Sequence, residues 1–549
     1  MPRGPFRHQL IALLAMIAAM LGIAVMSHAG QSPANTSRVS RPPAAVAVVE
    51  AGAAALGGAD RIRAVRNITA HGYGVYAYHF GGSSITGGTH VPQKLIAANE
   101  LSRVYDLEHD RFQLVERRNW LFPFLIKSGH EWLQTNIILD GDIAWTVDGG
   151  TARRLARWEE GVNWIDGPVM QRMWMMNNPV VLLRALLDAE TQLAAPRTEG
   201  KDTAIDVTLK QGYRLTVAFG PDRLPTWVRW ATPQTNLGQM SFTTWFSGWS
   251  DINGLLLPLG LATDDNWRAT RYFSLFVDAY DIDSSIESLA APAAIRNTPE
   301  PQAFPPLTLT SEQVGRGIWR ISNGTTVVEF ADHLVIYELS SNVRQSKQVL
   351  DYARSLVPGK PIRYLVPSHN HFDHVRGLRQ AVAEGITIIT RPLTAAQIAE
   401  TLEGATPEYP DDYSRNPQPF KSILLDEHLR LQDATQTLDV YWMRNNGHMA
   451  DGVFAHAPEQ KVLMEADMVT AALDLQHWPD NFRDMLAYYK LDVEKISPVH
   501  TVVPGATVLT RAQGEQLLKE GTQRAREHCA AKKAAGVYHP GCPIQSRYY

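Results

Sequence analysis

Between residues 45 and 291, apolar and polar residues alternate over short stretches, which is the period of half-buried β-strands. The alternation is clearest at residues 67–78, 103–115, 204–209, 213–219 and 227–231. One helix should interrupt these strands, because Asn178 can cap a helix, Pro179 suits its first position and residues 180–187 supply an apolar face. The pattern predicts a mostly antiparallel, curved sheet with one helix packed on it.

After residue 306 the pattern changes, and strands alternate with helices. Strands are predicted at residues 317–322, 325–330, 333–339 and 362–366, with helices at 343–356 and 375–383 on either side of the last strand. This alternation is typical of layered α/β domains, in which catalytic groups gather where strands end. The chain as a whole is therefore predicted to be a multidomain protein of α+β and α/β character.

Composition suggests where the domains begin and end. Residues 30–44, rich in Ser, Pro and Ala, are predicted to form a linker, and a second linker is predicted at residues 292–306. Prolines should exclude both ladder and helix from the second linker, namely Pro292, Pro299, Pro301, Pro305 and Pro306. We therefore expect an N-terminal β-rich domain at residues 45–291, a second domain at 307–520 and a C-terminal tail at 521–549.

The first residues have the pattern of a targeting segment. Arg3 and Arg7 precede an apolar run at residues 10–26, which ends in small residues around Ala29. This predicts a signal peptide at residues 1–29 and a periplasmic or secreted protein. Retention as an anchor is the alternative, because the run is near the lower limit for a spanning helix. No later segment is apolar for long enough to span a bilayer, so no stable membrane insertion is expected after cleavage.

Length and charge narrow the classes of protein and partner. The 549 residues, 45% of them hydrophobic, are enough for two folded domains. A net charge of −4 supplies no basic field for phosphate backbones, so a small-molecule substrate is expected and nucleic acid is not. The oligomeric state stays open. Cys529 and Cys542, the only cysteines, can pair in an exported protein or remain two free thiols.

The strongest chemical signal directly follows the predicted strand at residues 362–366. His369, His371, Asp373 and His374 lie within six residues. Residues two apart in an extended segment face the same side, so His369 and His371 can bind one metal, while Asp373 and His374 can face a second. Imidazole and carboxylate groups suit zinc, iron or manganese. A loop of solvated histidines is the alternative, but such loops rarely place a carboxylate among the histidines after a buried strand.

The pattern His-x-His-x-Asp-His at residues 369–374 resembles the loop of metallo-β-lactamase-fold hydrolases, which hold two metals between two β-sheets flanked by helices. The resemblance implies an αββα sandwich and three further ligands. His448 would be the third ligand of the first metal, Asp467 the bridge between both metals, and His500 a ligand of the second metal. The sequence departs from the commoner residues of the family beside these ligands, at Ser368, Ala466 and Thr501.

Three other residues near the motif need a role. His477, a rival of His500, lies in what resembles a surface loop. In a regular strand Glu465 points away from Asp467, so it should be solvated or support the ligands without binding metal. His456 should not bind metal either. Residues 403–420, which separate the two ligand-bearing halves, are predicted to form a lid, with Tyr409, Tyr413 and Phe420 as candidates to line a pocket.

The turns at residues 220–225, 237–238 and 249–258 give the N-terminal half a strand-turn rhythm. This rhythm loosely resembles the half-barrels of periplasmic lipoprotein carriers. The resemblance implies a concave apolar face that holds an acyl chain or docks on the second domain. A scaffold or docking role is preferred, because likeness of fold alone does not define function.

The ligand set implies an exported hydrolase with two divalent metal ions, zinc by first choice and iron or manganese as alternatives. These ions can hold a bridging hydroxide, which Asp373 can orient and whose proton it can accept as the hydroxide attacks the substrate. Because Asp467 would bridge the metals, the site resembles thioesterases, lactonases and phosphodiesterases, so an ester, lactone, thioester or related small-molecule substrate is expected. The alternatives are a β-lactamase, a mononuclear iron enzyme like a sulfur dioxygenase, or a lipid-binding periplasmic protein with a vestigial metal domain.

Overall fold

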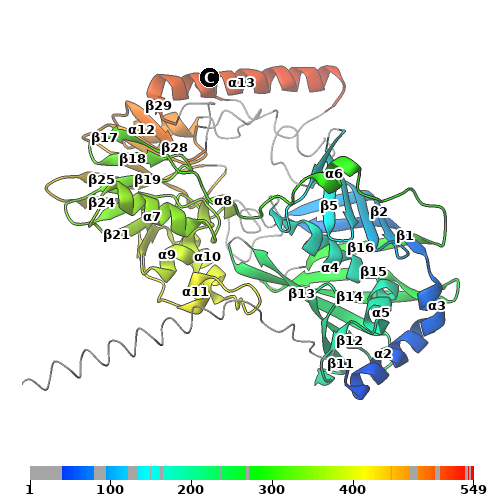
Figure 1. Cartoon of the computed structure of the whole chain (residues 1–549). Helices are drawn as coiled ribbons and strands as arrows, with labels where there is room; N and C mark the ends of the chain where they lie inside the picture. The colour runs from blue at the N-terminus through cyan, green and yellow to red at the C-terminus, as the bar shows by residue number, and fades with distance from the viewer. Residues whose placement is uncertain are drawn as a thin grey trace, which may run out of the picture.

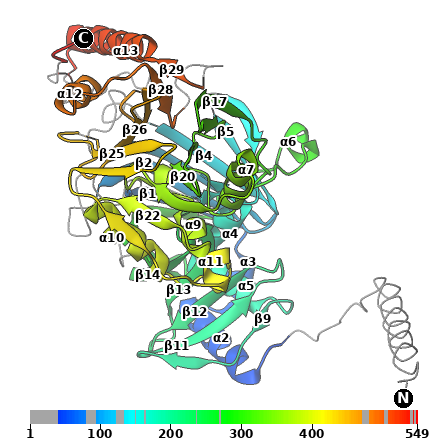
Figure 2. The same cartoon turned by 90° about the vertical axis from the view of Figure 1, so that its left-hand side faces the viewer.

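The computed structural model describes residues 40–78, 94–121, 133–148, 150–160, 165–234, 236–267, 271–446, 448–469, 480–500, 507–537, 542 and 546–549. The predicted signal peptide, most of the first linker, His477 and Thr501 lie outside these residues. Two domains lie side by side, each built on its own sheets (Figure 1). Figure 2 shows the C-terminal domain in front of the long N-terminal sheet.

In the N-terminal domain, helices α2 (Pro43–Leu56) and α3 (Ala59–Ala64) precede a large antiparallel sheet. The strands that pair along it are, in chain order, β1 (Asn67–Ala77), β2 (Leu95–Asp106), β3 (Arg111–Trp120), β4 (Leu133–Asp140), β5 (Ile143–Asp148), β6 (Thr151–Arg154), β9 (Gln192–Leu193), β10 (Arg197–Glu199), β11 (Asp202–Thr208), β12 (Arg214–Phe219), β13 (Pro225–Gln234), β14 (Gly238–Ile252), β15 (Leu255–Asp265) and β16 (Arg271–Ile282). Strand β1 pairs with both β2 and β16, which joins the first and last strands into one sheet. A short separate hairpin is formed by β7 (Glu159–Glu160) and β8 (Ile165–Asp166).

Most predicted strands are confirmed, with one correction. The alternation at residues 103–115 belongs to two strands, β2 and β3, which a tight turn separates. The turn is possible because Asp110 adopts a left-handed backbone with φ 56° and ends the extended run. The apolar pattern resumes in the next strand at Phe112 and Leu114, which are buried, so alternation alone did not reveal the break.

Helices α4 (Pro168–Met176) and α5 (Pro179–Leu187) contact each other beside this sheet. The helix predicted after Asn178 is α5, and the Asn178 side chain accepts hydrogen bonds from the backbone N–H groups of Val180 and Val181. A second helix, α4, was not predicted; all its residues are buried, the polar Gln171 and Arg172 included, so no side of it faces solvent. It contacts β3, β4 and β5 on one arm of the sheet and β13 on the other, so it fills the concave face. This packing favours the scaffold interpretation.

The prolines of the second linker suggested that it contains no helix, and this prediction is wrong. Residues 293–297 form a short helix, α6 (Ala293–Asn297), with Pro292 at its N-cap. Proline disrupts a helix only in the helix interior. At the N-terminus the backbone N–H groups have no acceptor within the helix, so the N–H that proline lacks is not needed there. The Arg296 side chain then binds Asp140 and ties the linker to the N-terminal sheet.

The C-terminal domain is a four-layered αββα sandwich, as the resemblance implied. One sheet comprises β17 (Ser311–Gly315), β18 (Ile318–Ile321), β19 (Thr326–Glu329), β20 (Leu334–Tyr337), β21 (Ile362–Val366), β22 (Thr387–Thr390) and β23 (Ser422–Leu424). The other comprises β24 (His428–Gln432), β25 (Thr437–Trp442), β26 (Val453–Ala457), β27 (Val462–Glu465), β28 (Lys495–Pro498) and β29 (Leu509–Thr510). The two sheets share an apolar core that includes Val335, Val366, Val440 and Met464.

Helices cover both outer faces of this sandwich. Helices α7 (Ser346–Leu356), α9 (Leu378–Ala383) and α10 (Pro392–Glu403) bury apolar side chains against the first sheet. Helices α12 (Asn481–Tyr488) and α13 (Arg511–Ala534) do so against the second. Each sheet is thus covered on both sides, which explains why β20 and β27 are buried at every position.

The helix predicted at residues 375–383 is divided into α8 (Phe372–Val375) and α9. The division falls at Gly377, whose N–H donates to the Leu339 carbonyl at 3.0 Å. A Cβ at this position would lie 2.3 Å from Leu339 Cγ, so the close approach requires glycine. The break leaves α8 as a separate single turn, which follows His369 and His371 and carries Asp373 and His374.

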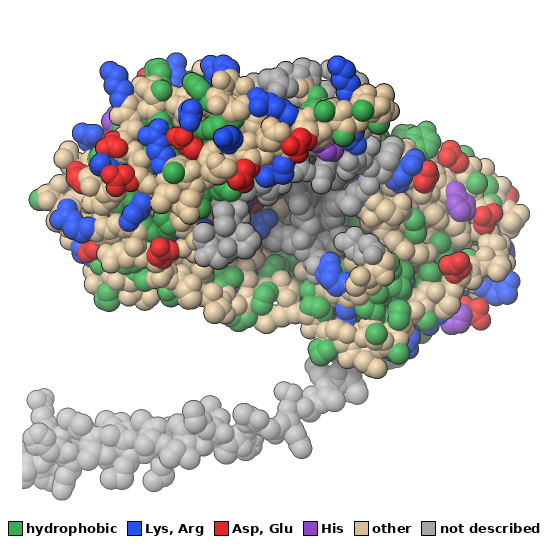
Figure 3. All heavy atoms as spheres, turned by 90° about the horizontal axis from the view of Figure 1, so that it is seen from above, with side chains coloured by type: hydrophobic (Ala, Val, Ile, Leu, Met, Phe, Trp, Pro, Cys, Tyr) green, Lys and Arg blue, Asp and Glu red, His purple; other side chains and the backbone are tan. Residues whose placement is uncertain are grey.

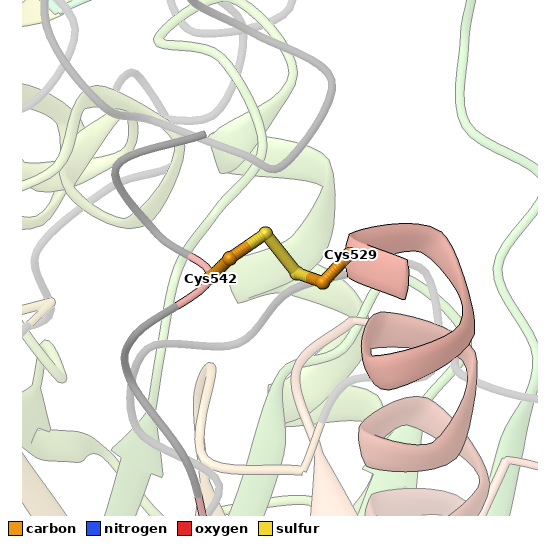
Figure 4. The surroundings of a disulfide bond; sticks show 2 residues. All are labelled: Cys529 and Cys542. Atoms are coloured by element: carbon orange, nitrogen blue, oxygen red, sulfur yellow. A yellow bond between two sulfur atoms is a disulfide. The ribbon is translucent and has the colours of Figure 1, made fainter. Parts of the chain in front are cut away.

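A disulfide joins Cys529 on α13 to Cys542, so the predicted pairing is confirmed (Figure 4). Helix α13 runs from residue 511 to residue 534, so the domain boundary expected at residue 520 falls inside a helix. Its low apolar content explains why this end of the domain looked like a tail. Among the described residues, none of the helices combines the length and apolarity needed to cross a bilayer.

The buried cap of α5 gives a stability prediction. Asn178→Ala should lower the free energy of unfolding by about 1 kcal/mol, because it removes the acceptor for two N–H groups that have no other partner in the helix. Chemical denaturation followed by circular dichroism measures this change. Asn178→Ser is the matched control, since serine also caps helices and should retain most of the stability; equal losses in both variants would contradict the capping role.

Candidate metal centre

The predicted ligands meet where strands of both sheets end. His369 and His371 follow β21, and Asp373 and His374 lie on α8. The remaining three come from the second sheet: His448 follows β25, Asp467 follows β27 and His500 follows β28. Strands β27 and β28 are parallel neighbours, with Glu465 opposite Pro498, so the residues after them emerge side by side.

The structure brings these side chains together in two groups. His369, His371, His448 and Asp467 each offer one donor atom within 4.8 Å of the others. Asp373, His374 and His500 form the second group under the same limit. This division matches the one that the sequence pattern and the resemblance implied for a first and a second metal.

Asp467 lies between the two groups. Its Oδ2 is 2.9 Å from His448 Nε2 in the first group and 3.4 Å from His374 Nε2 in the second. Its Oδ1 is 3.0 Å from His500 Nε2. The Asp467 backbone has φ 64°, a left-handed conformation that is uncommon for a non-glycine residue and that turns the carboxylate toward both groups.

A buried glutamate that the sequence reasoning missed orients the second group. Glu338 is fully buried and its Oε2 lies 3.0 Å from His374 Nδ1, which leaves Nε2 to face the site. Its other oxygen accepts the backbone N–H of Ser368, and the Ser368 hydroxyl lies 2.8 Å from His369 Nδ1. Glu338 follows β20 far from the motif, and only its position after a buried strand could have signalled it.

The second sheet has its own supports for the ligand loops. Asn446 Oδ1 accepts the backbone N–H groups of His448 and Met449, at 2.7 and 3.1 Å. The buried guanidinium of Arg320 donates to the carbonyl of Pro498, which fixes the strand end just before His500. Hydrogen bonds to residues outside the predicted ligand set therefore support His369, His374 and His448 and the strand end before His500.

Of the two roles expected for Glu465, solvated or supporting, the structure excludes the first, because the side chain is fully buried. Its Oε2 accepts the backbone N–H groups of Met468 and Val469, so it holds the turn that follows Asp467. Burial raises the pKa of Glu465 to about 8. His456 is used structurally, as its Nε2 lies 3.0 Å from the Asp492 carbonyl.

The electrostatics of the centre favour neutral imidazoles beside a positive charge. Burial, together with neighbouring histidines, lowers the pKa of His369 and of His371 well below the ordinary value. At His374, burial opposes protonation, but Asp373, Asp467 and Glu338 outweigh it and raise the pKa. Acidic groups thus surround a buried point at which a cation is stabilised.

Two buried donor atoms fit a bound metal. His369 Nε2 and Asp373 Oδ1 are shielded from solvent and make no hydrogen bond with the described residues. A buried polar atom without a partner costs about 1–3 kcal/mol, unless something else binds it. Five imidazoles and two carboxylates are donors that zinc accepts, so the residues present fit a metal.

The N-terminal domain reaches this centre. Tyr78 follows β1 and is buried, and burial together with the charge of Asp373 raises the pKa of its hydroxyl. The hydroxyl therefore stays protonated close to a predicted ligand. Seen from above, acidic and basic side chains are interspersed over the described surface of both domains (Figure 3).

The segment at residues 403–420, predicted as a lid, packs between the domains. Asp411 is buried against Arg379 of α9, and the Arg379 guanidinium lies 5.0 Å from the Tyr413 ring centre. The Tyr409 ring packs edge-on against Trp158 of the N-terminal domain, at 5.9 Å. Through Tyr409 this segment contacts the N-terminal domain, while Asp411 and Tyr413 contact Arg379 of its own domain, so the segment connects the domains.

Comparison with known proteins agrees with this geometry. Residues 322–505 match the model of the metallo-beta-lactamase superfamily. A metallo-beta-lactamase from Pontibacter korlensis is 18% identical over 39% of this chain and 99% of its own, with a TM-score of 0.29. One from Pseudomonas aeruginosa, crystallised in a mono-zinc form, is 16% identical over 40% of this chain and 97% of its own, with a TM-score of 0.31.

No curated protein matches the chain. The family match covers the sandwich with the candidate metal centre and begins after the N-terminal sheet ends. The C-terminal domain therefore has the metallo-β-lactamase fold, and the match supports a metal-dependent hydrolase in general terms.

Proposed function

We propose that this chain is an exported hydrolase with a binuclear metal centre, acting on an ester, lactone, thioester or related small molecule. The observation that carries the proposal is the position of Asp467, whose two carboxylate oxygens face donors of both groups. A shared carboxylate of this kind fits two neighbouring ions better than one.

The residues would divide as the two groups do. His369, His371 and His448 would hold one ion, and Asp373, His374 and His500 the other, with Asp467 shared between them. Two divalent ions, zinc by first choice, supply a water whose pKa is lowered from about 15.7 toward 7, together with positive charge for the developing oxyanion.

Asp373 would provide the proton transfer. Its Oδ2 lies 3.4 Å from His374 Nε2, while its buried Oδ1 makes no hydrogen bond with the described residues. Although burial alone would raise its pKa, the neighbouring His374 holds it below the ordinary value, so the carboxylate is ionised at neutral pH. An ionised oxygen in this position can orient a nucleophile and accept its proton.

Metal content tests the binuclear proposal. Protein purified with zinc should hold close to two ions per chain by elemental analysis, and chelation should abolish hydrolysis in a screen of lactone, thioester, phosphodiester, sulfate-ester and β-lactam substrates. Asp467→Ala should lower the zinc content, because its carboxylate faces both groups. A content near one ion that added metal does not change would contradict the proposal.

The proton-transfer role predicts a large loss in Asp373→Asn. This change keeps the size of the side chain but removes the charge, so kcat should fall by about 10² to 10⁴ on the substrate that the screen identifies. Steady-state kinetics measure it, with zinc content determined on the same samples.

Glu465→Gln is the matched control for this variant. Glutamine also offers an oxygen to the N–H groups of Met468 and Val469, so activity should stay within about threefold of the parent. Parental activity in Asp373→Asn with both ions bound would disprove the role of Asp373. Equal losses in both variants would instead indicate a shared effect on folding.

The export proposal predicts the N-terminus of the mature chain. The basic residues Arg3 and Arg7 and the apolar run after them should be removed, leaving a protein that begins near Gly30 outside the cytoplasm. Mass spectrometry of the protein from fractionated cells determines this. An intact Met1 in the cytoplasmic fraction would contradict export.

A further inference from the structure

The hairpin between β13 and β14 of the N-terminal domain inserts into the C-terminal domain beside the candidate metal centre. At its tip, Asn236 is buried, and its Nδ2 donates a hydrogen bond of 2.7 Å to the carbonyl of Phe372. Phe372 is the first residue of α8, and its carbonyl belongs to the peptide group that leads into Asp373. The two domains thus meet on the backbone of a predicted ligand.

Helix α8 needs support from outside itself. It has four residues, and the hydrogen bonds that close it run from the N–H groups of His374 and Val375 to the carbonyl of His371. A single turn does not hold its shape in isolation, because nucleating a helix fixes several residues for few hydrogen bonds. The direction of Asp373 and His374 therefore depends on neighbouring elements.

The N-terminal domain supplies part of that support. Besides the Asn236 hydrogen bond, the Trp267 ring after β15 packs against the Phe372 ring at 5.2 Å. The C-terminal domain contributes Glu338, which reaches His374. Asn236 and Glu338 thus hold α8 from two domains, one through its backbone and one through an imidazole.

The hairpin tip is itself rigidly placed. Gln234 Oε1 accepts the backbone N–H groups of Asn236 and Leu237, at 2.6 and 2.7 Å, which fixes the turn that presents Asn236. Gly238 has φ 75°, and a Cβ there would lie 2.8 Å from Asp411 Oδ2, so the tip fits closely against the other domain. Because the turn is fixed in this way, the position of Asn236 can determine that of the Phe372 carbonyl.

We infer that Asn236 is a positioning residue of the metal centre, and that the N-terminal domain completes this centre by holding α8 in place. The inference rests on the proposed function, because it assigns α8 to the second metal. Asn236 contacts neither metal nor substrate in this assignment; it acts through the Phe372 carbonyl on Asp373 and His374.

A comparison of two interface variants tests this inference. Asn236→Ala removes the hydrogen bond to Phe372. Gln239→Ala removes the hydrogen bonds that Gln239 Oε1 accepts from the backbone of Glu408 and Tyr409, at 2.9 and 3.2 Å. Both side chains are buried in the same interface, but Gln239 contacts a segment without predicted ligands. The probe is Zn²⁺ alone, titrated calorimetrically into the metal-free full chain.

Asn236→Ala should weaken binding of the second zinc ion about 10- to 100-fold, the usual effect of losing a group that orients ligands. Its kcat should fall while KM stays within about threefold. Gln239→Ala should lower the melting temperature about as much as Asn236→Ala does, but it should leave the affinities for both zinc ions unchanged. Asn236→Ser, whose hydroxyl is too short to reach the carbonyl, should behave like Asn236→Ala and serves if the alanine variant does not fold.

Unchanged zinc affinities in both Asn236 variants, beside a parent that binds two ions, would overturn the positioning role and leave the proposed function intact. Equal weakening in Gln239→Ala would also overturn it, since the effect would then follow from interface stability alone. A parent chain that binds no zinc would overturn the proposed function and this inference together.

Discussion

The carboxylate of Asp467 reaches both groups of donors because two parallel strands, β27 and β28, end beside each other at the edge of a sheet. That arrangement collects acidic and imidazole groups in a buried space, where unpaired charge is costly. Part of this cost is offset by hydrogen bonds. Glu338, Ser368 and Asn446 each form one with a ligand or with its loop. Both Asp467 and Glu338 adopt left-handed backbones, a strain that a well-packed sandwich can hold.

The N-terminal domain also contacts the elements that carry the candidate ligands. Helix α4 packs between the two arms of its sheet, against β3, β4 and β5 on one side and β13 on the other. The hairpin between β13 and β14 reaches the second domain, where Asn236 contacts α8. The residue after β1, Tyr78, lies close enough to Asp373 to feel its charge. The segment at residues 403–420 packs against both domains and makes the contact continuous. The N-terminal domain thus contacts the helix that carries Asp373 and His374.

Local sequence signals were reliable where one element decided the outcome. The cap at Asn178 placed α5, the apolar run at residues 362–366 placed β21, and the spacing of His369 and His371 placed two donors on one side. Local signals failed where the environment decided. Helix α4 is buried all round, its polar residues included; the helix after residue 374 is broken where Gly377 meets Leu339; and the prolines of the linker permitted α6.

The sequence by itself determined the ligand types and spacing at His369, His371, Asp373 and His374, because metal chemistry constrains residue type and motif spacing is local. The other three candidates, His448, Asp467 and His500, were implied by the resemblance to a family. Only the tertiary structure decided which residues hold those ligands in place. Glu338, Arg320 and Asn236 lie far along the chain from the side chains or backbone that they support. Hydrogen bonds of this kind leave no periodic or compositional trace, because they depend on how sheets and domains pack. The role of Glu465, buried and not solvated, was decided in the same way, by the turn that its oxygen supports.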